Sequence, residues 1–171
     1  YPTAYEFHGP HRTQSIWVNP DAGPPSKVQA SAYMRLGACA MKLWPEALEM
    51  SQQYLAIFPN VFLFGSPVQH FLHTVFPISA DKSRGVIRLY WVGEDASASE
   101  RFAREYSMGI ARDIHTEDRS VIEAGQRGLS SGALEHIHFQ EQESLCRHLF
   151  NSVDAMVQAY KAGLETQGAL K

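Results

Sequence analysis

Residues 97–126, SASERFAREYSMGIARDIHTEDRSVIEAGQ, decide the fold class of this chain. Ser97, followed three residues later by Glu100, is the pattern of a capping box, in which two side chains bond the free backbone amides that begin a helix. The pattern predicts a helix that runs to about Gln126. Directly before it lie strand-like runs at 60–65, 69–78 and 86–93. The turns between these runs are too short for crossover connections, so the strands should pair antiparallel.

Strand and helix signals also flank this central part of the chain. Residues 5–18 are rich in aromatic and β-branched positions and predict a strand, which the turn NPDAGPP at 19–25 would close. Residues 27–55 favour a helix with a break at Trp44–Pro45, and a last amphipathic helix should begin near Glu141. Antiparallel strands together with long helices indicate the α+β class, with the helices packed across a curved sheet.

Length and composition favour one globular domain over residues 1–171, since 44% of them are hydrophobic and 19% are charged. The 15 Lys and Arg and the 18 Asp and Glu are interspersed and give a formal charge of −3, which argues against binding to nucleic acid or to an anionic membrane. Cys39 and Cys146 cannot build a disulfide framework, so we expect a reducing compartment, the cytoplasm. Arg35 and Lys42 interrupt the longest apolar run, so no membrane span is expected.

Asp118 lies on the apolar side of the predicted long helix. At 100° per residue from Ile110, the apolar arc covers about 0–120° and contains Ile110, Val121, Ile114, Ala111 and Ile122. Asp118 falls near ~80°, whereas Arg112 and Arg119 lie on the opposite side near ~180–200°. A carboxylate among apolar side chains must be paired, hydrogen-bonded or bound to a metal. Two alternatives remain open: a kink near Gly125 that turns Asp118 outward, or an arginine from another element that pairs with it.

Several of the eight histidines are spaced closely enough to suggest a metal site. Two pairs have i, i+3 spacing in extended segments, where their side chains should point to opposite faces: His8 with His11, and His70 with His73. His136 and His138 are expected to share a strand face, and His115 lies one helical turn before Asp118. Either could contribute to a site, although surface or hydrogen-bonded histidines are the more common case.

Residues 117–132, EDRSVIEAGQRGLSSG, carry a resemblance to a known family, together with EQE at 141–143 and a helix that contains His148. The segments YEFHGPHRTQS at 5–15 and IFPNVFLF at 57–64 extend it upstream. The chain resembles the C-terminal catalytic domain of Rieske-type aromatic-ring-hydroxylating oxygenase alpha subunits. This resemblance implies a helix-grip fold, with a long helix across an antiparallel sheet and a mononuclear Fe(II) in the pocket between them.

The resemblance also implies roles for individual residues. Asp118 matches the carboxylate that completes a facial set of two histidines and one carboxylate around the iron. Met108 and Ile114 match positions of the substrate pocket, for which ordinary core packing is the alternative. Glu117 and His115 are candidates for groups that hydrogen-bond an iron ligand rather than the iron itself. The two histidine ligands, and a domain that holds a [2Fe–2S] cluster, are expected to precede Tyr1, so the chain should be a truncated fragment.

The implied parent protein is an oxygenase that adds oxygen from O2 to a small aromatic or related apolar substrate. Its electrons would come from NAD(P)H through a reductase or a ferredoxin and then the [2Fe–2S] cluster, in a homo-oligomer, a trimer. Dioxygenation, monooxygenation and demethylation are all compatible with this scaffold. The fragment alone should bind little iron and be inactive. The alternative function is a metal-free helix-grip module that binds a hydrophobic ligand.

Overall fold

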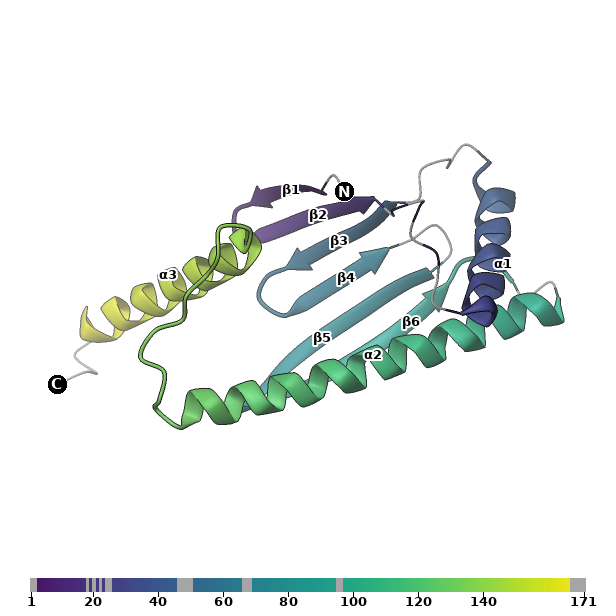
Figure 1. Cartoon of the computed structure of the whole chain (residues 1–171). Coiled ribbons are helices and arrows are strands. Elements are labelled where there is room, and N and C mark those ends of the chain that lie inside the picture. Colours follow the sequence, from purple (N-terminus) through teal and green to yellow (C-terminus); the bar gives the residue numbers. More distant parts are fainter. Residues whose placement is uncertain are drawn as a thin grey trace.

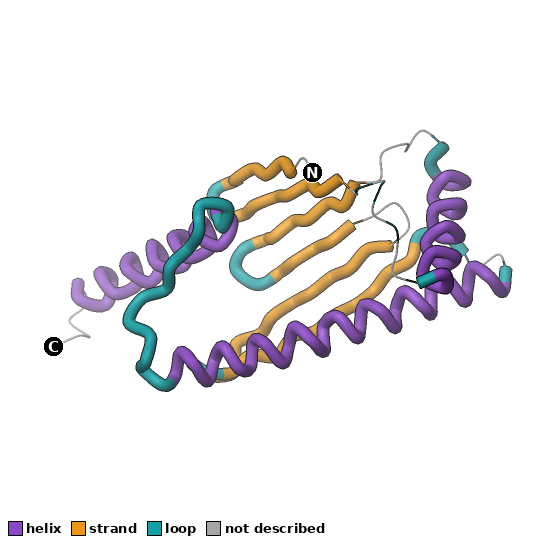
Figure 2. The backbone as a smooth tube through the Cα atoms, in the orientation of Figure 1, coloured by secondary structure: helices purple, strands orange, loops and turns teal. Residues whose placement is uncertain are grey.

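In the computed structural model the chain forms one six-stranded antiparallel sheet, with the strands in sequence order, and three helices (Figures 1 and 2). The structure describes residues 3–17, 19, 21, 23, 26–45, 51–65, 69–94 and 97–166. The strands are β1 Thr3–His8, β2 His11–Trp17, β3 Ser51–Ile57, β4 Val61–Gly65, β5 Gln69–Ser79 and β6 Lys82–Trp91. The helices are α1 Lys27–Leu43, α2 Ala98–Ser130 and α3 Ser144–Thr166. The expected α+β helix-grip class is confirmed.

The first strand-like segment is a hairpin and not the single strand expected over 5–18. The chain reverses at Gly9, whose φ of 59° supplies the left-handed conformation that a two-residue hairpin loop needs at its first position. His8 and His11 pair directly across the hairpin. They therefore lie on the same face of the sheet, and the expectation of opposite faces is wrong for this pair. Position 18 and part of the expected turn at 19–25 lie outside the described residues.

Only the first part of the segment 27–55, which is expected to be helical, forms a helix. Ser26 caps α1 by accepting the amide of Gln29, and the helix ends at Leu43, next to the predicted break. Residues 51–55 belong to β3 instead, and residues 46–50 lie outside the described part of the chain. Pairing with β2 and β4 on both sides satisfies the backbone of β3 and outweighs the helical preference of its Gln, Leu and Ala residues.

The three strands before the long helix are confirmed, with shifted ends. β5 runs one residue further than expected, and β6 begins at Lys82 and not at 86, because the hairpin turn at Ala80 and Asp81 is tight enough to pair Ser79 with Lys82. The turn signal of Gly85 is overridden by this pairing, and Gly85 lies opposite Val75 inside the ladder.

Of the two C-terminal helices, α2 begins where the sequence predicts and α3 begins later. Ser97 caps α2 through the amide of Glu100, as predicted, and α2 continues four residues beyond Gln126. The last helix begins at Ser144 and not near 141; residues 140–143 form a turn before it, in which the amide of Glu143 donates to the carbonyl of Gln140. Residues 133–143 form no strand, so the expected shared strand face of His136 and His138 is wrong; their rings lie edge to face at 6.3 Å.

Helix α2 runs along the sheet, whereas α3 begins beside the turn between β1 and β2 and extends past the ends of the strands (Figure 1). His115 of α2 stacks on Phe71 of β5 at 4.8 Å, and His148 of α3 stacks on Phe7 of β1 at 4.2 Å. Cross-strand pairing places Phe7 and Phe71 on one face, because directly paired residues of neighbouring strands point the same way. This face of the sheet, with α1 at one end of α2, encloses the cavity described below.

The buried core lies at the crossing of α1 and α2. It consists of Ala32, Leu36 and Ala40 of α1 and Ala103 of α2. Further along α2 the apolar residues are open to solvent, and Val121 and Ile122 are 67% and 69% exposed. None of the described helices is long and apolar enough to cross a membrane.

Candidate functional site

A cavity of about 660 Å³ lies between the sheet, α1 and α2. Its floor is mainly aromatic, because the register aligns Tyr54, Phe64, Phe71 and Leu89 in one row across four strands. Rings in neighbouring strands are in contact, with the centroids of Tyr54 and Phe64 4.9 Å apart. A pocket of this size and lining suits a small apolar ligand.

One face of α2 forms a wall of the cavity. The residues that line it recur at helical spacing: Ser107, Ile110, Ala111, Ile114, His115 and Asp118. The predicted arc therefore faces the cavity at Ile110, Ala111, Ile114 and Asp118, whereas its remaining members, Val121 and Ile122, do not line it and are exposed. The expected burial of Asp118 is not found, since Asp118 is exposed, like the apolar residues that follow it on α2. The described sheet and helices leave this end of the cavity open, so the carboxylate keeps access to water.

The carboxylate of Asp118 has no hydrogen bond or ion pair with another described residue. Two arginines of the same helix pair with other residues: Arg119 with Glu123 at 3.6 Å, and Arg112 with Asp113 at 3.0 Å. The helix also continues through Gly125 to Ser130. Among the described residues, no arginine of another element pairs with Asp118, so that alternative is not observed. A kink near Gly125 that turns Asp118 outward is not observed either, because Asp118 lines the cavity.

His115 connects α2 to the sheet. Its Nδ1 lies 2.6 Å from the carbonyl oxygen of Ala111, so Nδ1 carries the proton and Nε2 is left without one in the neutral ring. Its ring stacks on Phe71 and lies edge to face with His73 at 6.2 Å. Burial lowers the pKa of His73, and the positive charge that His115 can carry lowers it further. The sequence pattern gave no role to His73, because only the fold brings it to His115.

The residues matched to the substrate pocket separate in the structure. Ile114 lines the cavity with Asp118, whereas Met108 lines a neighbouring groove of about 510 Å³ with Ile87 and Arg112. Glu117 lines neither space, and its backbone carbonyl accepts the hydroxyl of Ser120. The structure thus brings Ile114, His115 and Asp118 together and leaves Met108 and Glu117 away from them.

The cavity has a polar end that the sequence pattern did not reveal. It consists of Gln52, Tyr54, Gln69 and Ser107, all of which line the cavity. The Tyr54 hydroxyl donates to Oε1 of Gln52 at 3.0 Å, and the Ser107 hydroxyl donates to Oε1 of Gln69 at 3.2 Å. Assigning residues 51–55 to a helix concealed this group, because the alternation that turns Gln52 and Tyr54 toward the cavity exists only in a strand.

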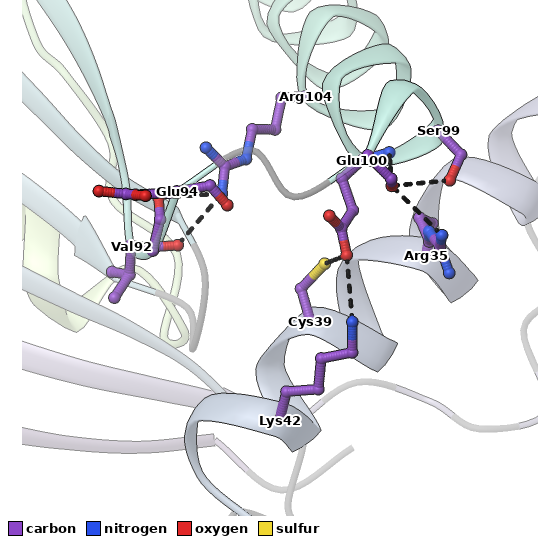
Figure 3. A network of polar contacts seen from close by, with 10 residues as sticks. Arg35, Cys39, Lys42, Val92, Glu94, Ser99, Glu100 and Arg104 are labelled. Atoms are coloured by element: carbon purple, nitrogen blue, oxygen red, sulfur yellow. Dashed lines mark hydrogen bonds and ion pairs between the residues drawn. The ribbon is translucent and has the colours of Figure 1, made fainter.

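The buried carboxylate of Glu100 connects the beginning of α2 to α1 through hydrogen bonds (Figure 3). Glu100, only 3% exposed, accepts hydrogen bonds from the thiol of Cys39 at 3.3 Å and from Nζ of Lys42 at 3.4 Å. The Cys39 hydrogen bond, with smaller contributions from Lys42 and Ser97, lowers the pKa of Glu100 to about 2 against the opposing effect of burial. Burial and the Glu100 carboxylate raise the pKa of the Cys39 thiol, which makes it a poor nucleophile.

The donor set around the cavity fits one position of an iron site and does not complete one. Asp118 offers an accessible carboxylate without a protein partner, on the wall of an apolar cavity. Within the described residues, no three His, Cys, Asp or Glu side chains come close enough to hold a metal ion together. Two more ligands would have to come from elsewhere.

Comparison with known families identifies the same relationship that the motif suggested. The family model of the ring hydroxylating alpha subunit (catalytic domain) matches residues 2–159 of this 171-residue chain. No curated protein matches the sequence. The expected resemblance is confirmed over the strands, the cavity and most of α3.

Proposed function

Since the chain belongs to the ring hydroxylating alpha subunit (catalytic domain) family, we propose that it forms the substrate cavity of an oxygenase that hydroxylates an aromatic or related apolar compound with O2. One observation carries the proposal: the carboxylate of Asp118 lines an apolar cavity and has no partner among the described residues. A carboxylate that lines the cavity without a described protein partner suits a metal ligand.

In this proposal Asp118 would supply one ligand to a mononuclear Fe(II), and two histidines from a segment before residue 1 would supply two more. A facial set of three protein ligands leaves coordination positions open, and the iron supplies the site at which O2 is activated. Electrons would come from NAD(P)H through a reductase or ferredoxin and a [2Fe–2S] cluster. A homo-oligomer of the full-length subunit belongs to the same proposal.

The chain's own residues bind and orient the substrate. Phe62, Phe64 and Phe71 offer flat apolar surfaces to a ring, and Ile110 and Ile114 contact it from the helix side. His115, held by Ala111 and stacked on Phe71, fixes the height of α2 above the sheet. It thereby positions Asp118, which lies less than one turn further along the helix.

The test is iron content and turnover in a longer protein that includes the upstream histidines. We expect Asp118→Ala to reduce bound iron at least tenfold and to abolish substrate oxidation coupled to O2 consumption. Glu123→Ala, an exposed carboxylate on α2 that does not line the cavity, is the matched control and should keep its iron. Stoichiometric iron in the Asp118→Ala protein would refute the ligand assignment. The 171-residue chain alone should bind little iron and be inactive.

A metal-free module that binds an apolar ligand is the second candidate. The size and aromatic lining of the cavity favour it. The coding sequence upstream of residue 1 separates the two functions. An upstream reading frame without a two-histidine segment and paired cysteines and histidines would favour the binding module.

A further inference from the structure

We propose that the polar end of the cavity binds a neutral hydrogen-bond acceptor on the substrate, a carbonyl or ether oxygen at the end remote from the reacting carbon. This inference rests on the proposed function for the place of the reaction, near Asp118. It adds a substrate class: an elongated apolar molecule with one uncharged oxygen at its far end.

The hydrogen bonds at the polar end leave a donor for a ligand. The Tyr54 hydroxyl occupies Oε1 of Gln52, so the amide group presents its Nε2 hydrogens on the other side. That nitrogen has no acceptor among the described residues. A donor on the wall of an apolar cavity loses free energy whenever the cavity is filled by a ligand without an acceptor, so it discriminates in favour of a ligand that has one.

The second amide and hydroxyl pair makes the same end of the cavity polar from the opposite side. Gln53 and His70 both pair with Gly65, so their neighbours Gln52 and Gln69 lie at the same level of the sheet, two strands apart. That separation is roughly 10 Å, enough for a small group to enter between them. Ser107, buried on α2, donates to Gln69 and closes this end from the helix side.

The charges around the cavity exclude an anionic substrate. Among the described residues that line it, Asp118 is charged and neither Lys nor Arg occurs. The histidine that lines it, His115, lies three residues from Asp118 on α2 and eight from Ser107 at the polar end. A carboxylate group bound at the polar end would have no cation to pair with and would lose its hydration. The oxygen should therefore be neutral.

The length of α2 between the two ends sets the size of the substrate. Ser107 and Asp118 are eleven residues apart in one helix, which is about 16 Å along its axis. A hydrogen bond at one end and the metal with its oxygen at the other leave roughly 10 Å for the apolar body. Two linked or fused rings have this length.

Equilibrium dialysis of the 171-residue chain with three probes tests the inference without iron. The probes are 4-acetylbiphenyl, its isosteric alkene 4-isopropenylbiphenyl, and biphenyl-4-carboxylate. We expect the ketone to bind about threefold to tenfold more tightly than the alkene, and the carboxylate more weakly than the ketone.

The variant Gln52→Glu replaces the donor by an acceptor of the same size. It should remove the preference for the ketone over the alkene. Gln53→Glu is the matched control, since Gln53 is the next residue on β3 and lies on the opposite face of the sheet; it should keep the preference.

Equal affinity for ketone and alkene, tightest binding of the carboxylate, an unchanged preference in Gln52→Glu, or no binding of any probe would each overturn the inference. The iron content of the Asp118→Ala protein tests the proposed function separately. Loss of iron together with equal affinity for ketone and alkene would retain the iron site and reject the polar end.

Discussion

Replacing Ala103 by Leu should destabilise the protein through the crossing of α1 and α2. Ala103 is fully buried, and Ala32 and Ala40 across the interface are 1% and 6% exposed, so the two helices approach each other through methyl groups. The additional carbons of a leucine have no space there and must push the helices apart. Overpacking of this kind costs about 1–3 kcal/mol. In a chain of this length that lowers the melting temperature by about 2–12 °C.

Thermal unfolding followed by circular dichroism is the assay, with Ala124→Leu as the matched control. Ala124 is also within α2 but exposed, so the same substitution should change the free energy of unfolding by less than about 0.5 kcal/mol. Equal melting temperatures for the two variants would refute the packing argument. A lower melting temperature for Ala124→Leu than for Ala103→Leu would place the core elsewhere on α2.

Three further outcomes follow from the described contacts. The pKa of Glu100 is lowered from 4.5 to about 2 in the folded protein, so the ionised carboxylate stabilises the fold fully above about pH 4.5 and progressively less as the pH falls toward 2. Glu100→Gln should therefore flatten this part of an acid-unfolding curve, and an unchanged curve would contradict the argument. Arg104→Met removes a guanidinium that donates hydrogen bonds to the carbonyl oxygens of residues 92–94, after β6, at 3.1–3.4 Å. It should lower the free energy of unfolding, measured by urea titration, by about 1–2 kcal/mol. No loss would show that water replaces those hydrogen bonds. In Gly85→Ala the new Cβ would lie 2.9 Å from Nε2 of His73, so the His73 ring should turn at a cost of about 1 kcal/mol and its NMR signal should shift. In Gly109→Ala nothing lies within 4 Å of the new Cβ, so this variant should stabilise the protein by about 0.5–1 kcal/mol. Equal effects of the two variants on the free energy of unfolding would contradict this reasoning.

Local signals predicted those parts of the fold that depend on neighbours in sequence. The cap at Ser97 and the arc from Ile110 to Asp118 are properties of one helix, and the structure has both. β3 was missed because its stability comes from β2 and β4, and the composition of residues 51–55 favours a helix. The hairpin at Gly9 was missed because the turn lies inside an otherwise continuous strand pattern.

In the candidate site, too, local sequence patterns predict some features, whereas others depend on contacts between distant segments. The direction of Asp118 follows from helical periodicity, whereas its exposure depends on what covers the open end of the cavity. Gln52 and Gln69 reach one end of the cavity only through the pairing of β3, β4 and β5. His73 meets His115 for the same reason, across 42 residues of sequence that no local pattern connects.

Because α2 is long, a small tilt of this helix at the core displaces the residues that it places along the cavity. Ala103, where α1 crosses it, and Asp118 are fifteen residues apart, or about 22 Å along the axis. A tilt of about 3° at the crossing moves the carboxylate by about 1 Å, and a displacement of that size costs about 100-fold in a rate that depends on geometry. A substitution under α1 can therefore be mistaken for damage to the site, although it touches no ligand. Screens for altered activity should recover residues of the crossing as well as residues of the cavity.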